Sequence, residues 1–151
     1  MEPTVADELA MINIKRRQLW LLEKRQKERL AEIEERLAAL AGDMEPGSLH
    51  LQRVKCGPNC KCNNGTGHGP YYFLYRWTPG GQVKRYVRKS EVERIRRRLS
   101  NYREYRVLAK EAHSIEEFLD VGVAIADIRL GAKVTALLEK TVKDTCRSKG
   151  A

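Results

Sequence analysis

The stretch KCGPNCKCNNGTGHGPYYFLY, Lys55 to Tyr75, places three cysteines and a histidine directly before a run of aromatic residues. The chain has 151 residues and four cysteines, and three of them fall within seven positions. The spacing is Cys-x3-Cys-x-Cys-x5-His, which we call the Cys/His knuckle: Cys56, Cys60, Cys62 and His68. Thiolates and imidazole are ligands that zinc prefers, and four of them complete a closed tetrahedral site. The spacing therefore predicts one structural zinc ion per chain.

The fourth ligand is open at this point, because His50 or the distant Cys146 could take the place of His68. Two other interpretations compete with zinc. The cysteines could be reduced and unligated in a glycine-rich turn, or they could hold an iron–sulfur cluster, which usually has a fourth cysteine nearby. The N-terminal residues MEPTVADELAMINIKRR lack the pattern of a secretory signal. A cytoplasmic location is expected, where thiols stay reduced and clustered cysteines bind metal more often than they pair.

The net charge of +9 is unevenly distributed along the chain. Residues 1–50 carry a net charge of −2, residues 51–106 carry +11, and residues 107–151 are neutral. The whole excess therefore lies in the segment that begins with the knuckle. Such a field favours a polyanionic partner, with nucleic acid ahead of a membrane surface. The simpler alternative is a solvated basic surface that keeps the protein soluble. No apolar run is long enough to span a bilayer, so no membrane role is expected.

The N-terminal segment predicts one long helix over residues 5–41. Thr4 and Asp7 have the spacing of a capping box, and Gly42 followed by Pro46 is typical of a helix end. A heptad stripe with a polar middle runs through the segment: Leu9, Ile12, Arg16, Leu19, Glu23, Gln26, Leu30, Ile33, Leu37 and Leu40. This pattern resembles a coiled coil and predicts a homo-oligomer, with a dimer expected, or packing on the chain's own C-terminal helices.

The middle segment predicts a short strand over residues 49–55 and a β-hairpin over residues 71–77 and 82–88. The sequence TPGG between the hairpin strands supplies turn chemistry. Alternation places Tyr71, Phe73, Tyr75 and Trp77 on one face of the hairpin. This aromatic row could be the core under the hairpin or a platform on which bases stack. We expect the core, which would leave the opposite face, with Tyr72 and Arg76, available for contacts.

Two further helix starts are predicted from capping-box patterns, at Ser90 with Glu93 and at Ser114 with Glu117. Residues 114–145 are apolar on most sides, which is typical of a buried helix and makes them the best partner for the N-terminal helix. Gly131 is a candidate break in this segment. The fold class expected is α+β, mainly α. Its parts are a long N-terminal helix (1–45), the knuckle with a basic hairpin (46–89), and a basic helix followed by apolar C-terminal helices (90–151).

The pattern KCGPNCKC, then GTGHGPYYFLYRW, then GQVKRYVRKSEVERI and LSNYRE resembles an uncharacterised family of small bacterial and archaeal proteins. The resemblance covers residues 49–108, leaves both flanking helical regions outside, and has no established function to transfer. It implies that Cys56, Cys60, Cys62 and His68 act as a unit.

A basic hairpin and helix next to a zinc knuckle predict a nucleic-acid-binding protein, with DNA preferred over RNA. A regulator or accessory factor of a mobile element is the role expected. The candidate contact residues are Lys84, Arg85, Arg88, Lys89, Arg94, Arg97, Arg98, Tyr72 and Arg76. The alternatives are a protein-interaction adaptor that docks through its long helix, and an RNA- or ribosome-binding protein. No nucleophile–base pair or phosphate-binding glycine motif stands out, so neither an enzyme nor a small-molecule substrate is expected.

Overall fold

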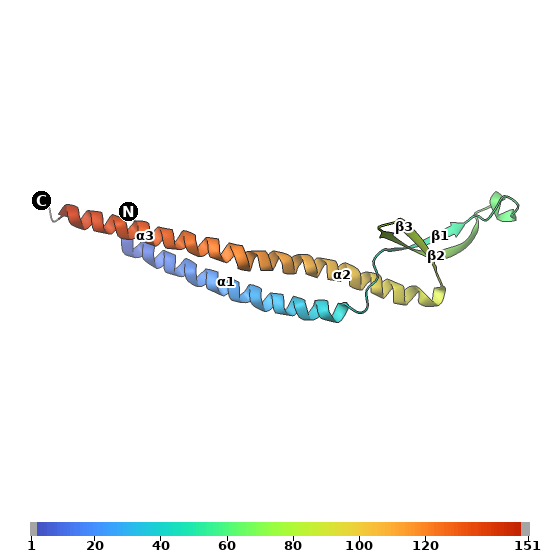
Figure 1. Cartoon of the computed structure of the whole chain (residues 1–151), viewed down its shortest axis with the longest axis horizontal. Coiled ribbons are helices and arrows are strands. Elements are labelled where there is room, and N and C mark those ends of the chain that lie inside the picture. The colour runs from blue at the N-terminus through green and yellow to red at the C-terminus, as the bar shows by residue number, and fades with distance from the viewer. Residues whose placement is uncertain (1–2, 149–151) are drawn as a thin grey trace. The chain divides into compact units, whose positions relative to one another are not determined.

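The computed structural model describes residues 3–148, apart from the side chains of Asn63 and of residues 144–148. Its elements are α1 (Val5–Leu40), β1 (Ser48–Val54), the 3-10 turn η1 (Lys61–Asn64), β2 (His68–Thr78), β3 (Gly81–Val87), the 3-10 turn η2 (Lys89–Glu91), α2 (Val92–Glu117), the π-helical turn η3 (Phe118–Gly122) and α3 (Val123–Ser148) (Figure 1). The fold is α+β and mainly helical, as predicted. It divides into a helical unit, up to Glu35 and from Lys110 onward, and a sheet unit, Arg36–Ala109.

The start of α1 is a capping box, as its sequence predicts. The backbone N–H and the hydroxyl of Thr4 donate to Asp7 Oδ2 at 2.9 and 2.6 Å, and the Asp7 N–H donates to Thr4 Oγ1 at 3.2 Å. These bonds satisfy backbone donors that a helix start leaves without partners. The hydroxyl bond from Thr4, followed by the bond from its N–H, lowers the pKa of the Asp7 carboxyl.

In the helical unit, the heptad stripe of α1 packs within the chain. Ile12 and Ile33 are buried, and of the ten stripe residues only Arg16 is exposed. An ion pair joins Arg16 to Asp127 of α3 at 3.8 Å, and a second joins Arg29 to Glu111 of α2 at 2.8 Å. Later residues of α1 thus meet earlier residues of the C-terminal helices, so the arrangement is antiparallel (Figure 1).

The two expected interruptions of the C-terminal helices are absent. Residue 114 lies inside α2, and the Ser114 hydroxyl donates to the Lys110 carbonyl at 3.1 Å, one turn back, so it caps no new helix. Gly131 lies inside α3, where its carbonyl accepts the Thr135 hydroxyl at 3.3 Å. The predicted helix start at Ser114 is wrong, because a capping sequence starts a helix only where the preceding residues are not already helical. Residues 107–113 include strong helix formers such as Ala109 and Ala112. The predicted break at Gly131 is also wrong, because the helix continues on both sides of that residue.

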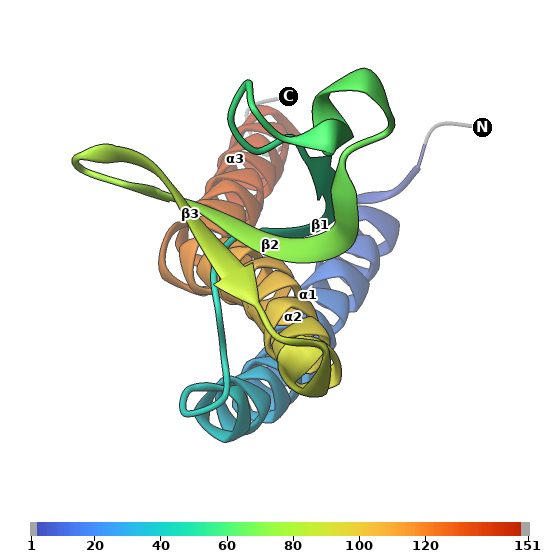
Figure 2. The same cartoon turned by 90° about the vertical axis from the view of Figure 1, so that its right-hand side faces the viewer.

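The sheet has the order β1-β2-β3 with both pairs antiparallel, and it confirms the expected strand and hairpin (Figure 2). In β1, His50 pairs with Phe73, while in β3 Lys84 pairs with Tyr75. Directly opposite residues share a face of the sheet, and neighbours along a strand point to opposite faces. His50, Phe73, Tyr75 and Lys84 therefore lie on one face of the sheet.

The core of the sheet unit lies between the sheet and α2. Its buried side chains are Leu74, Val87, Val92, Ile95 and Leu99, with Leu49 and Tyr72 packed against them. The buried face of β2 is therefore the Tyr72–Leu74 face, and the expectation that the aromatic row forms the core is wrong. The Val, Ile and Leu side chains of α2 pack on the aliphatic side chains of the sheet, and both faces of β2 carry large apolar residues, so alternation alone did not decide between them.

The linker between α1 and β1 is tied to α2. Arg98 donates to the Met44 carbonyl at 2.9 Å, and its guanidinium lies 3.0 Å from the Glu45 carboxylate. The Asn101 side chain donates to the Asp43 carbonyl at 2.8 Å. The helical run before α2 begins at Lys89, where the Arg88 N–H donates to Glu91 at 3.4 Å. The expected Ser90–Glu93 box is thus replaced, since the Glu93 carboxylate accepts from Arg96 at 2.7 Å.

Candidate metal centre

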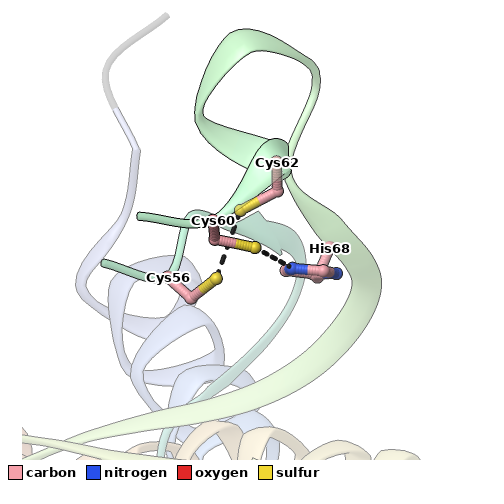
Figure 3. Close-up of side chains that lie close together, drawn as sticks. All are labelled: Cys56, Cys60, Cys62 and His68. Atoms are coloured by element: carbon pink, nitrogen blue, oxygen red, sulfur yellow. Dashed lines mark hydrogen bonds between the residues drawn. The ribbon is translucent and has the colours of Figure 1, made fainter. Parts of the chain in front are cut away.

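Four ligand side chains converge at the tip of the β1–β2 connection (Figure 3). The Sγ atoms of Cys56 and Cys62 are 3.3 Å apart, and the Sγ of Cys60 is 3.3 Å from Nε2 of His68. All four ligand atoms lie within 4.8 Å of one another. Two thiolates on one tetrahedral zinc stand about 3.8 Å apart, given Zn–S bonds of about 2.3 Å. The group is therefore close enough to hold a metal ion.

The ligands come from three parts of the chain that strand pairing brings together. Cys56 follows β1, Cys60 and Cys62 flank the start of η1, and His68 is the first residue of β2. The antiparallel pair Val54–His68 closes the loop between the two strands. Within the loop the Cys60 N–H donates to the Gly57 carbonyl at 3.2 Å, which closes a turn between Cys56 and Cys60, and the start of η1 bends the chain between Cys60 and Cys62.

The two glycines on either side of His68 hold it in place. Gly67 and Gly69 have φ values of 82° and 111°, in the left-handed region that favours glycine. A Cβ atom at Gly67 would lie 3.0 Å from the Val54 carbonyl oxygen, and one at Gly69 would lie 2.9 Å from the Tyr71 nitrogen. Larger residues at these positions would displace β2 from β1 and carry His68 away from the cysteines.

The thiols of the knuckle are free of disulfides and differ in acidity. Hydrogen bonding to Cys56, and then to the Cys62 backbone N–H and to His68, lowers the pKa of Cys60 to about 6. Hydrogen bonding to Cys60 and Cys62 raises the pKa of Cys56 to about 12, because that thiol keeps its proton beside them. The geometry thus favours a thiolate at Cys60, which is the form of cysteine that binds metals.

His68 belongs to the cluster and His50 does not. His50 lies within β1, where its Nε2 is 2.8 Å from the Ser48 hydroxyl and its ring contacts Tyr75 edge-on, with centroids 5.2 Å apart. The side chain of the other alternative ligand, Cys146, lies outside the described residues. Among the described side chains, the proposed set of three cysteines and His68 is the one that comes together.

The cations predicted to contact nucleic acid fall into two groups, those paired with a carboxylate and those without such a partner among the described side chains. The first group consists of four arginines: Arg76 pairs with Glu45 at 3.9 Å, Arg94 with Glu91 at 3.0 Å, Arg97 with Asp43 at 3.0 Å, and Arg98 with both Asp43 and Glu45. The expected cluster of helix arginines is therefore largely occupied by ion pairs. Sequence reasoning missed the carboxylates of the linker, Asp43 and Glu45, because they lie far from their partners in the chain.

The second group consists of four cations without a carboxylate partner among the described side chains: Lys84, Arg85, Arg88 and Lys89. Lys84 lies over the Phe73 ring, 4.0 Å from its centroid, and donates to the side-chain amide oxygen (Oε1) of Gln52 at 3.3 Å. Tyr72 was expected to be exposed and is half-buried instead, with the Arg96 guanidinium 5.7 Å from its ring centroid. The sequence analysis preferred the core for the aromatic row, and in the structure that row faces outward.

The family model described as a domain of unknown function (DUF6788) matches residues 21–97, which is 77 of the 151 residues. The matched range includes the four ligands, the sheet and the beginning of α2. It also reaches back into α1, which the motif-based resemblance left outside. No curated protein and no solved structure matches the chain. None of the described helices is long and apolar enough to cross a membrane.

Proposed function

This chain belongs to the DUF6788 family of domains of unknown function, and we propose that it is a zinc-stabilised, self-associating DNA-binding protein. The observation that carries this proposal is the charge of the sheet. Strands β1, β2 and β3 contain no Asp or Glu. Four cations without a described carboxylate partner fall within the six positions 84–89. A surface of this kind gains affinity by replacing the counterions around phosphate groups.

The ligand chemistry supports zinc as the metal. Three thiolates and one imidazole are a common ligand set of structural zinc sites, and all four tetrahedral positions would be supplied by the protein. The ion would join the end of β1 to the start of β2 at a place with little apolar burial, since Cys56 and His68 are exposed. Zinc binding would therefore contribute folding free energy to the sheet and keep β1 and β2 in register.

The exposed apolar side chains of the helical unit support self-association. Ile128 and Val142 are 71% and 61% exposed, and contiguous exposed apolar surface marks sites of protein association. A groove between α1 and α3 is lined by further apolar residues: Leu19, Leu22, Ala126, Leu130 and Ala132. A second copy of the helical unit offers the same surface. Its association would bury the exposed side chains and the groove of both copies, as in a bundle of four helices.

The test is binding to a fluorescently labelled DNA duplex at several salt concentrations. If about five phosphates are neutralised, the logarithm of the association constant should fall with the logarithm of salt concentration with a slope of about −4 to −5. An RNA duplex of the same sequence serves as competitor. Absence of micromolar binding to both the duplex and a single strand at low salt would favour a protein-interaction adaptor. Stronger binding to the RNA duplex would favour an RNA-binding role.

A further inference from the structure

The outward face of the sheet carries a row of aromatic residues with one lysine. We call it the aromatic face, and its residues are Tyr71, Phe73, Tyr75, Trp77, Lys84 and Tyr86. The opposite face of the same strands packs on α2 through Leu74 and Val87. Trp77 is 78% exposed, Tyr86 is 51% exposed and Tyr71 is 38% exposed. These rings are therefore left in water by the fold of the sheet unit.

The rings of the aromatic face are not stacked on one another. The Tyr86 ring meets those of Tyr71 and Phe73 at interplanar angles of 74° and 69°, with centroids 6.0 Å apart in both cases. Same-face residues along a strand are about 6.8 Å apart. Flat groups can therefore be held against the exposed rings of Trp77, Tyr71 and Tyr86 without displacing a stacked pair, whereas the Phe73 ring is covered by Lys84.

The polar groups around the rings suit an anionic ligand with hydrogen-bonding edges. Lys84 supplies a positive charge beside Phe73 and Tyr75, with its ammonium 4.0 and 5.5 Å from the two centroids. Gln52 and Gln82 lie on the same face by their pairing with Tyr71 and Trp77. The strands contribute no carboxylate that would repel phosphate. A nucleotide would contact all three kinds of group, because its base stacks on a ring, the base edge bonds an amide and the phosphate meets the cation. A protein partner would contact fewer of them.

The spacing favours a single strand over a duplex. In a duplex the bases are stacked 3.4 Å apart along each strand and their faces are covered. Rings about 6.8 Å apart can take only bases that have separated from their neighbours, which single strands permit. Aromatic residues beside basic side chains are the means by which proteins bind single strands without reading their sequence.

We propose that the aromatic face binds single-stranded DNA, stacking bases on Trp77 and the neighbouring tyrosines and placing a phosphate near Lys84. This inference rests on the proposed DNA binding and adds the surface and the strandedness of the ligand. Trp77, the most exposed ring on this face, would be the main stacking contact. Arg88 and Lys89, which follow β3, would contact the backbone of the same DNA strand, whereas Arg85 lies opposite Leu74 on the other face of the sheet.

The experiment measures binding of labelled dT15 to the full-length protein by fluorescence anisotropy. Trp77→Ala should weaken binding roughly ten- to hundredfold, the order expected for the loss of one or two stacked bases. The salt dependence should stay unchanged, because no charge is removed. Trp77→Phe should restore most of the affinity. Trp20→Ala makes the same change at an exposed tryptophan of the helical unit and should bind as the unaltered protein does.

A second readout does not depend on the folding of the alanine variant. In a Trp20→Phe background Trp77 is the sole tryptophan, and stacking on dT15 should quench its fluorescence. Unchanged fluorescence on binding, Trp77→Ala affinity within twofold of the original, or duplex binding as tight as dT15 binding would each overturn the inference. Binding of rU15 ten times tighter than dT15 would overturn the assignment to DNA. The proposal of DNA binding itself would be contradicted by a different result, in which neither the duplex nor dT15 binds at low salt.

Discussion

The Nε2 atom of His68 lies 3.3 Å from the Sγ atom of Cys60, although His68 begins β2 and Cys60 lies in the loop before it. The pair meets because the backbone of residue 68 is paired with Val54 of β1. The ligand set and the register of the sheet therefore depend on each other. A bound metal would hold the register, and loss of the register would disperse the ligands.

The first prediction concerns the metal. Protein purified without added metal should contain about one zinc per chain by elemental analysis, and His68→Ala should lower that content. His50→Ala is the matched control, because His50 bonds Ser48 away from the cluster, and it should retain its zinc. Cys60→Ser should increase amide hydrogen exchange in β1 and β2 more than in α3, since metal binding is coupled to the folding of its site. Full zinc content in His68→Ala would remove His68 from the ligand set.

The second prediction concerns the linker between α1 and β1. Arg98→Ala removes the bond to the Met44 carbonyl and leaves Glu45, only 12% exposed, without its close partner. The free energy of unfolding should fall by about 1–3 kcal/mol in urea denaturation. Arg94→Ala is the control, because its pair with Glu91 is one helical turn away and exposed, and it should cost less than about 1 kcal/mol. Equal effects of the two variants would contradict the assigned role of Arg98.

The third prediction assigns the phosphate contacts to the end of β3. The triple variant Arg85→Ala, Arg88→Ala and Lys89→Ala should weaken binding to all DNA sequences and flatten the salt dependence by about two to three units. The control removes three exposed lysines of α3, Lys133, Lys140 and Lys143, and should leave the slope nearly unchanged. If both triple variants flatten the slope equally, binding depends on net charge and not on this strand.

The fourth prediction is the pH dependence of the pair between Arg29 and Glu111. The hydrogen bonds from Arg29 lower the pKa of the Glu111 carboxyl below its usual value near 4.5. A depressed pKa in the folded state means that the stabilisation is complete above about pH 4.5 and is lost as the pH falls through the folded pKa. Glu111→Gln should therefore lower the thermal midpoint at neutral pH and match the original protein in strong acid.

The control for this pH profile is Glu116→Gln, at an exposed position of α2. It should leave the midpoint and its pH dependence nearly unchanged. A difference between Glu111→Gln and the original protein that grows on acidification would contradict the sign of the linkage.

The fifth prediction is a dimer or higher oligomer formed by the helical unit. Light scattering at micromolar concentration should give a mass of at least about twice the 17.3 kDa of one chain. Ile128→Asp places a charge on the most exposed apolar side chain of α3 and should shift the mass to that of the monomer. Asn13→Asp adds the same charge at an exposed polar position of α1 and should not. A monomeric original protein would contradict self-association.

The local elements of the fold could be predicted from the sequence. The spacing of Cys56, Cys60, Cys62 and His68 predicts a metal group because each ligand is chemically distinctive and the loop between them is short. The capping box at Thr4 and the hairpin around TPGG depend on residues that are close together in the chain. Their geometry is set mainly by backbone sterics and local hydrogen bonds, and the structure confirms both.

The burial of β2 depended on contacts between distant residues. Both faces of that strand carry large apolar side chains, so alternation alone could not show which face would meet α2. The close fit of Leu74 against Ile95 and its neighbours determines the outcome, and it leaves Trp77 in water. The availability of the α2 arginines also depended on distant residues, since Arg98 pairs with Glu45 of the linker. Packing and ion pairing are collective properties of the folded chain, and they determine which of the predicted side chains remain free to bind a partner.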